Sequence, residues 1–142
     1  MSEDIHYIVY TSAASKLLND QNLTEILNSC RRNNQKLNVT GMLLYSEGVF
    51  IQVLEGAENT ISELYQRILI DPRHHSTLLL TRGISDTRQF PDWRMGFRKL
   101  SRKQLAVRSG ITDFLSPDFD CRQFLDNPSV PHKLLLSFRK NM

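Results

Sequence analysis

The pattern of apolar positions predicts a β-hairpin near the middle of the chain. Residues 42–46 and 49–54 are apolar at nearly every position, and only Glu47 and Gly48 separate them. Such a pair favours a tight turn between two antiparallel strands. Because apolar side chains would project from both sides of each strand, we expect other parts of the chain to cover both faces of this hairpin.

Gln52 interrupts the second strand of the hairpin. By the two-residue alternation of a strand, it shares a face with Phe50 and Leu54, while the odd-numbered residues point the other way. A buried primary amide costs about 1–3 kcal/mol unless it is hydrogen-bonded, so we expect a partner close to it. That partner could be a neighbouring backbone or hydroxyl group of purely structural importance, or part of a functional site.

Three further strands are predicted from the same kind of pattern. Residues 5–10 alternate as a first strand that ends at Tyr10, and residues 77–81 form a fourth strand. Residues 93–98 alternate between apolar and polar side chains, which predicts a fifth strand with one apolar face.

Two helices are predicted between these strands. Asn22 and Thr60 are each followed three residues later by glutamate, which is the pattern of a capping box at a helix start. Asn33 and Asn34 are expected to end the first helix, since asparagine tolerates the left-handed conformation found there. The Asp-Pro pair at residues 71–72 is expected to end the second helix.

This order of elements predicts an α+β fold. A ferredoxin-like βαββαβ sheet with an added fifth strand would carry two helices on one face and place the first strand beside the third. Residues 104–115 and 132–139 have helical apolar patterns, and C-terminal helices there could cover the other face. We expect one domain at residues 1–100 and a helical appendage at residues 101–142.

Composition narrows the possible functions. The 142 residues are 40% hydrophobic and 23% charged, which is ordinary for one globular domain. The net charge of +3, from 18 basic and 15 acidic residues, is too even to indicate nucleic-acid binding. Cys30 and Cys121 make neither a disulfide framework nor a metal set. Without an apparent signal peptide or apolar span, we expect a cytoplasmic protein that binds no metal, nucleic acid or membrane.

Several polar and sulfur-containing side chains converge on one groove of this predicted fold, between the two helices and above the sheet. A groove of this kind would suit a flat polar ring, with amide groups at its edge and cations near its exit. The residues are Tyr10, Asn34, Gln52, Arg67, Asp71, Arg73, His74, Trp93 and Met95.

Four segments in order resemble the BLUF family, whose members sense blue light using FAD. They are YIVYTSAAS, RRNNQKLNVTGMLLYSEGVFIQVLEG, DPRHHS and DWRM. The spacing also agrees, because Asn34 lies seven residues before Gly41, Gln52 lies eleven after it, and Trp93 lies forty-one beyond Gln52. The resemblance covers about residues 5–100, and the tail matches the short single-domain members only loosely.

The resemblance implies a role for each matching residue. Tyr10 matches the tyrosine that donates an electron and a proton to the excited flavin ring, and Gln52 matches the glutamine that links this tyrosine to the ring. Asn34 matches the asparagine at the carbonyl and imide edge of the ring, with Asn33 adding a second contact. A mobile pair in the fifth strand is matched by Trp93 and Met95. The residues that fall where the family reaches the ribityl chain and phosphates are Arg67, Asp71, Arg73 and His74.

The implied function is a photoreceptor that holds FAD without a covalent bond, and FMN or riboflavin can substitute for it. Rotation or tautomerisation of the Gln52 amide would change the hydrogen bonds it presents to the ring and shift the absorption to longer wavelength. We expect a sensor and not an enzyme, which signals to a downstream protein or by a change of homo-oligomer.

Other classes of protein compete with this interpretation. A small flavin-binding redox protein would use the same pocket, but the chain has no Gly-rich nicotinamide fingerprint. An acylphosphatase-like enzyme would need a phosphate loop with arginine, and residues 11–15 contain no arginine or glycine. An RNA-binding sheet needs exposed aromatic residues on its central strands, and residues 49–56 offer only Phe50.

Overall fold

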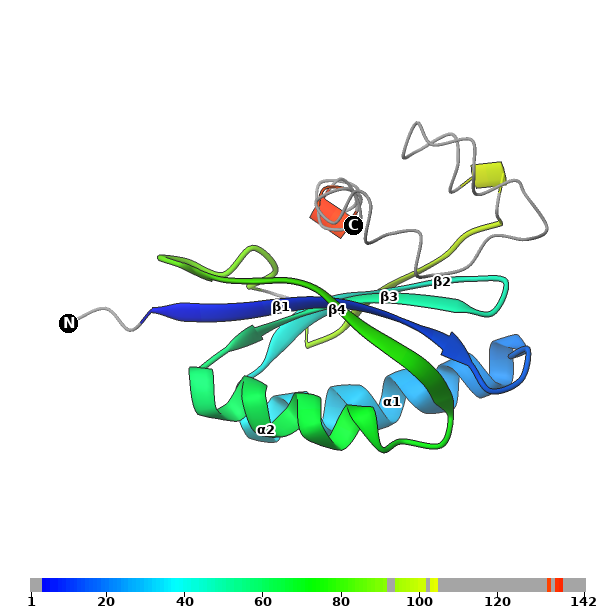
Figure 1. Ribbon diagram of the computed structural model, residues 1–142, viewed down its shortest axis with the longest axis horizontal. Helices are drawn as coiled ribbons and strands as arrows, with labels where there is room; N and C mark the ends of the chain where they lie inside the picture. The colour runs from blue at the N-terminus through cyan, green and yellow to red at the C-terminus, as the bar shows by residue number, and fades with distance from the viewer. Residues whose placement is uncertain (1–3, 92–93, 102, 105–132, 134, 137–142) are drawn as a thin grey trace.

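The computed structural model describes residues 4–91, 94–101, 103–104, 133 and 135–136. Five strands form one sheet, and two helices lie side by side on one of its faces (Figure 1). In chain order the elements are β1 (Ile5–Ala14), α1 (Asp20–Leu37), β2 (Thr40–Ser46), β3 (Val49–Gly56), α2 (Glu58–Leu69), β4 (His74–Ser85) and β5 (Gly96–Lys99). Within the described residues, no helix has the length and apolar character needed to cross a bilayer.

The strand order β4-β1-β3-β2-β5 confirms the predicted ferredoxin-like sheet with a fifth strand. β1 pairs antiparallel with β3 and β4, β2 pairs antiparallel with β3, and β5 adds to β2 in parallel. β3 is therefore the central strand, and β1 is its neighbour as predicted. The β2–β3 turn has φ of 43° at Glu47 and 92° at Gly48, the two positive values that a tight type I′ hairpin requires.

The predicted strand ends were wrong in three places. β1 continues to Ala14, so Tyr10 lies within the strand and not at its end. The polar residues after it stay in the sheet because they pair with strands on both sides, and the buried Thr11 hydroxyl donates to the carbonyl of Phe50 at 2.7 Å. β4 is longer than predicted, and β5 begins only at Gly96, so Met95 lies just before it.

The helix ends also differ from the prediction. α1 begins one turn earlier, where Asn19 and Asn22 form a capping box in which each side chain accepts from the other's backbone N–H. α1 also continues past Asn34 to Leu37, and its C-cap, Asn38, takes the left-handed conformation at φ 55°. α2 begins at Glu58, and its N-cap, Ala57, makes no side-chain hydrogen bond, so the predicted cap at Thr60 was wrong.

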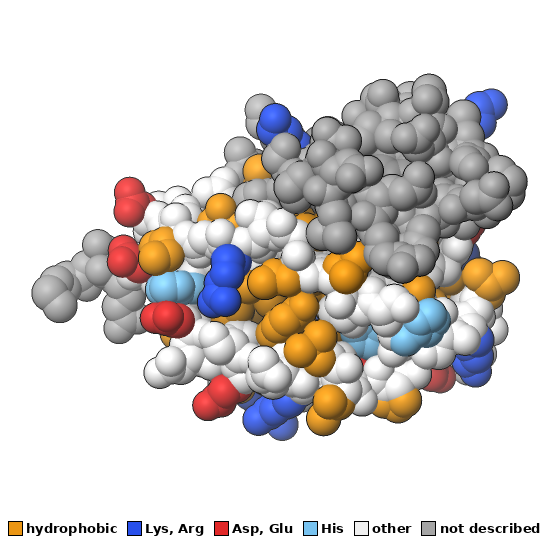
Figure 2. Space-filling view, in the orientation of Figure 1, with side chains coloured by type: hydrophobic (Ala, Val, Ile, Leu, Met, Phe, Trp, Pro, Cys, Tyr) orange, Lys and Arg blue, Asp and Glu red, His pale blue; other side chains and the backbone are white. Residues whose placement is uncertain are grey.

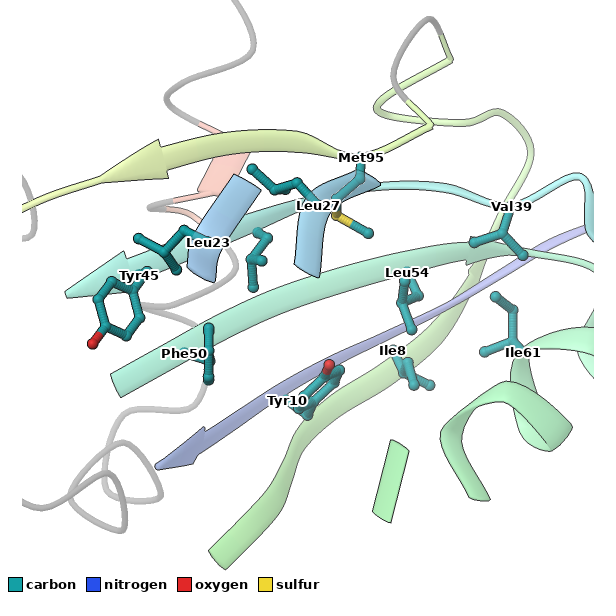
Figure 3. Packing of buried hydrophobic residues seen from close by; sticks show 11 residues of the cluster. Ile8, Tyr10, Leu23, Leu27, Val39, Tyr45, Phe50, Leu54, Ile61 and Met95 are labelled. Carbon is teal, nitrogen blue, oxygen red and sulfur yellow. The ribbon is translucent and has the colours of Figure 1, made fainter. Parts of the chain in front are cut away.

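Each face of the sheet has its own apolar core. Toward the helices, side chains of β1, β2 and β3 pack against α1 and α2, and Figure 3 shows Tyr10, Phe50 and Leu54 rising from β1 and β3 on this side. This confirms that Gln52 and its face neighbours point toward the helices. The second core lies on the other face and includes Val9, Met42, Leu44, Ile51, Val53 and Phe90.

The C-terminal part of the chain contributes to the second core. Leu135 is fully buried there and Leu136 packs beside it, and in Figure 1 this short segment lies across the sheet from α1 and α2. Most of the predicted helices at residues 104–115 and 132–139 lie outside the described residues. The division of the chain at residue 100 stays a prediction.

Candidate functional site

A cavity of about 170 Å³ opens between α1, α2 and the helix-facing side of the sheet. At about 30 Å³ for each water in the liquid, this volume corresponds to about six water molecules, so the cavity is large enough to admit part of a ring system. Nine of the ten residues predicted for the site line this cavity: Tyr10, Asn33, Asn34, Gln52, Arg67, Asp71, Arg73, His74 and Met95. The tenth, Trp93, lies outside the described residues.

Tyr10 and Gln52 form the floor of this cavity. They are Cα partners across the β1–β3 ladder, and the Tyr10 hydroxyl donates a hydrogen bond to Oε1 of Gln52. Both side chains are buried. Burial raises the pKa of Tyr10 well above its ordinary value, so the phenol carries its proton at neutral pH and serves as a donor.

The other end of the Gln52 amide contacts Met95. Its Nε2 group donates to Met95 Sδ at 3.3 Å, which gives the buried amide a partner at each end. The backbone around Met95 is held by α1, because Asn34 Nδ2 donates to the Arg94 carbonyl at 2.6 Å and Arg31 Nε donates to the Met95 carbonyl at 3.1 Å. Figure 3 shows the Met95 side chain beside Leu27 of α1.

Two asparagines bring amide groups to the α1 side of the cavity. Asn34 is buried and uses one amide N–H on Arg94, and within the described residues its second N–H and its amide oxygen remain for a bound group. Asn33 precedes it and is exposed at the cavity rim. Both lie within the helix, whose backbone fixes the direction of their side chains.

His74 lines the cavity and is held in place by hydrogen bonds at both ring nitrogens. Its Nε2 lies 2.6 Å from the Ile68 carbonyl, and its Nδ1 lies 2.7 Å from Ser12 Oγ. A carbonyl only accepts, so Nε2 carries the hydrogen and Nδ1 of the neutral ring accepts from the Ser12 hydroxyl. Both ring nitrogens are thereby engaged, and a bound group would meet the imidazole through its carbon atoms.

Charged side chains gather at the mouth of the cavity. The Asp71 carboxylate accepts from Nε of Arg73 at 3.0 Å and from its backbone N–H at 2.9 Å. These bonds to Arg73 lower the pKa of Asp71. Arg67 also lines the cavity, and within the described part of the chain it forms no ion pair, so its charge is available to an anion.

Several lining residues were missed by sequence reasoning. Ser12 lies two positions after Tyr10 in β1 and therefore on the same face of the strand. This alternation could have identified Ser12 as a lining residue. Cys30 lies one helical turn before Asn33 and Asn34, which could have placed it in the cavity, and burial raises the pKa of its thiol. The apolar walls come from Ile26, Leu43, Phe50, Leu54, Leu64 and Ile68.

This set of side chains fits a flavin. Apolar walls suit the faces of a planar ring, amides suit the carbonyl and N–H groups at its edge, and a cation at the mouth suits a phosphate. The chemistry of the cavity therefore matches the one expected from the sequence.

Comparison with known proteins agrees with this fit. The family model of BLUF, sensors of blue-light using FAD, matches residues 5–96. The photoactivated adenylate cyclase subunit beta of Euglena gracilis is 35% identical over 110 residues, which are 77% of this chain and 13% of that protein. The chain thus spans only a small part of the length of the curated relatives that it matches.

Two solved structures extend the similarity to most of the chain. The dark-state structure of BlrB, a BLUF protein, is 28% identical with a TM-score of 0.76 and covers 100% of both chains. The photo-activated state of BlsA is 25% identical with a TM-score of 0.72 and covers 94% of this chain and 95% of that one. The chain belongs to the BLUF family and is a flavin-binding sensor of blue light.

Proposed function

We propose that this chain binds FAD in the cavity and responds to light through the hydrogen bonds of Tyr10 and Gln52. The observation that carries the proposal is the chain of bonds from the Tyr10 hydroxyl through the Gln52 amide to Met95 Sδ, which lies in the cavity wall. Bound flavin supplies the absorption of blue light.

The Gln52 amide can exist in two arrangements. In the structure its oxygen accepts from Tyr10 and its nitrogen donates to Met95. Rotation of the amide would present the nitrogen to Tyr10 and the oxygen to Met95 Sδ, which has no proton to donate, so the bond to Met95 would be lost. Tautomerisation would instead reverse the Tyr10 bond without rotation. Both routes connect Gln52 to the segment that leads into β5.

Different parts of the cavity would hold different parts of the flavin. Asn33, Asn34 and Gln52 would hold the ring, while Arg67 and Arg73 would face the phosphates, and Asp71 would face the ribityl hydroxyls. His74 would pack against the bound group. FMN and riboflavin can replace FAD because the ring contacts are common to all three.

The light signal would pass to another protein or to a change of assembly. We propose that the chain is a cytoplasmic sensor module and not an enzyme. It would control an unidentified downstream signalling protein or change a homo-oligomer. Figure 2 looks toward β4, where hydrophobic side chains gather, and Leu79 and Ile84 of this edge strand are exposed. This surface supports self-association, which light scattering in darkness and under blue light would test.

The decisive experiment is an absorption spectrum of the purified protein, taken in darkness and again after a blue pulse. We expect a flavin spectrum that shifts to longer wavelength and relaxes in darkness. A bound flavin that bleaches under light would favour a redox flavoprotein. Absence of flavin after reconstitution with FAD would overturn the proposed binding.

A further inference from the structure

A buried carboxylate lies behind the switch, on the opposite face of β3. Glu55 is 1% exposed, and its side chain accepts three hydrogen bonds. The backbone N–H groups of Gln89 and Phe90 donate at 2.8 and 2.6 Å, and the Thr40 hydroxyl donates at 3.0 Å. A carboxylate is costly to bury unless such donors replace water, and these three do so.

Arg88, which precedes Gln89 and Phe90, adds further hydrogen bonds that hold residues 88–90 in place. Its Nη1 donates to Thr40 Oγ1 at 2.8 Å and to the Glu55 carbonyl at 3.0 Å, and its Nη2 donates to the Asn38 carbonyl at 2.7 Å. The planar fork of arginine is suited to such simultaneous bonds. Residues 88–90 are thereby tied to the end of β3, the start of β2 and the end of α1.

Residues 88–90 lie only a few positions before Met95 in the sequence. Phe90 is held by Glu55, and Met95, five residues later, contacts Gln52. Five residues span at most about 18 Å, so the position of Phe90 limits where Met95 can lie. Gln52 and Glu55 are three residues apart on β3 and project from opposite faces. β3 therefore bonds to the chain at both Phe90 and Met95, through Glu55 and Gln52 respectively.

We propose that Glu55 and Arg88 are positioning residues for the light response. By holding residues 88–90 against the sheet, they keep Met95 Sδ within reach of the Gln52 amide and so stabilise the dark arrangement. Among the described residues that line the cavity, neither Glu55 nor Arg88 is found, so their effect on the flavin would be indirect and would pass through Met95. The inference rests on the proposed Tyr10–Gln52 switch.

The first test is Glu55→Gln in the full chain with bound flavin. The amide has one acceptor oxygen in place of two, so it cannot accept all the bonds of the carboxylate. We expect the red shift to remain and dark recovery to slow about threefold or more, which corresponds to about 0.7 kcal/mol in the barrier. The matched control, Glu63→Gln on the exposed face of α2, should recover like the wild type.

A double-mutant cycle separates positioning from general destabilisation. Met95→Leu keeps the side-chain volume but removes the sulfur acceptor. If Glu55 acts through Met95, Glu55→Gln should change the recovery rate by less than about 1.5-fold in the Met95→Leu background, because coupled sites are not additive. An equal slowing in both backgrounds, or wild-type recovery in Glu55→Gln, would overturn the inference.

Arg88→Lys provides an independent variant if Glu55→Gln does not fold. It keeps the charge but loses the fork, and it should slow dark recovery in the same direction. Wild-type recovery in this variant would also count against the inference. A wild-type protein without any red shift would refute the switch itself, whereas a normal wild-type shift with unaltered variants would refute only the roles of Glu55 and Arg88.

Discussion

Tyr10 and Gln52 face each other across the two central strands, and the phenol hydroxyl donates to the amide oxygen in the cavity wall. The backbone ladder between β1 and β3 sets their separation, so neither side chain needs a mobile loop to reach the other. A switch built on this pair is therefore pre-organised before any ligand binds.

Tyr10→Phe should bind flavin and lose the light-induced red shift. The substitution keeps the ring that packs in the cavity but removes the only proton that Tyr10 offers to Gln52. Light-minus-dark absorption spectra would measure the effect. The control is Tyr65→Phe, because the centroids of the Tyr65 and Tyr10 rings lie 5.7 Å apart. This variant should leave the red shift intact. A normal shift in Tyr10→Phe would remove Tyr10 from the mechanism.

Gln52→Leu should likewise retain flavin and show no red shift. Leucine fills much of the same space but can neither accept from Tyr10 nor donate to Met95. Flavin content per protein and the light-minus-dark spectrum would be compared with those of Gln66→Leu, which changes an exposed glutamine of α2. Loss of the shift in both variants would mean that the effect is not specific to the Gln52 amide.

The red shift should keep its amplitude from about pH 7 to about pH 10. An exposed tyrosine has a pKa of about 10, and burial raises the pKa of Tyr10 well above that value. The folded protein therefore keeps the Tyr10 proton while the unfolded chain would lose it, so the associated stability is complete below pH ~10 and falls as pH rises further. A pH series of light-minus-dark spectra would check this. Loss of amplitude near pH 9 in folded protein would contradict it.

Gly41→Ala should lower the free energy of unfolding by about 3 kcal/mol. A Cβ at Gly41 would lie 2.0 Å from the carbonyl oxygen of Val53, so β2 and β3 would have to separate. Urea denaturation followed by circular dichroism would measure the loss. Gly56→Ala is the matched control, because its Cβ would meet neighbouring atoms at 3.4 Å or more. Equal stabilities of the two variants would contradict this account.

Arg67→Gln should weaken binding of FMN and FAD about tenfold and leave riboflavin binding nearly unchanged. Arg67 lies at the cavity mouth, where a phosphate would be held and riboflavin has none. A charge-assisted contact of this kind contributes about 1.4 kcal/mol, which is tenfold in the dissociation constant. Fluorescence titration of the apoprotein with each flavin would measure it. An equal loss for riboflavin would show that Arg67 supports the ring or the fold.

Much of the site was predictable because its geometry follows from local alternation. Gln52 was expected to share the helix-facing side with Phe50 and Leu54, and the structure confirms it. The fold followed from the order of periodic segments, and once that order is known the topology brings β1 and β3 together. The match to the BLUF motif then assigned the candidate side chains that the cavity gathers.

Element ends were less predictable, since competing caps lie within a few residues of one another. Asn19 and Asn22 both offer side-chain oxygens, and Asn34 and Asn38 both tolerate the left-handed conformation. Packing decides between them: Asn34 is buried against the segment before β5, so α1 continues to Leu37 and is capped by Asn38.

The pattern of residues along the chain was enough to predict the order of strands and helices and the face of β3 on which Gln52 lies. These depend on periodicities of two and 3.6 residues that are present in the chain without its partners. The bond between Gln52 and Met95 and the bond between Glu55 and Phe90, 35 residues away, could be identified only in the folded chain. Such bonds join segments with no shared periodicity, so they exist only after the sheet has brought the segments together.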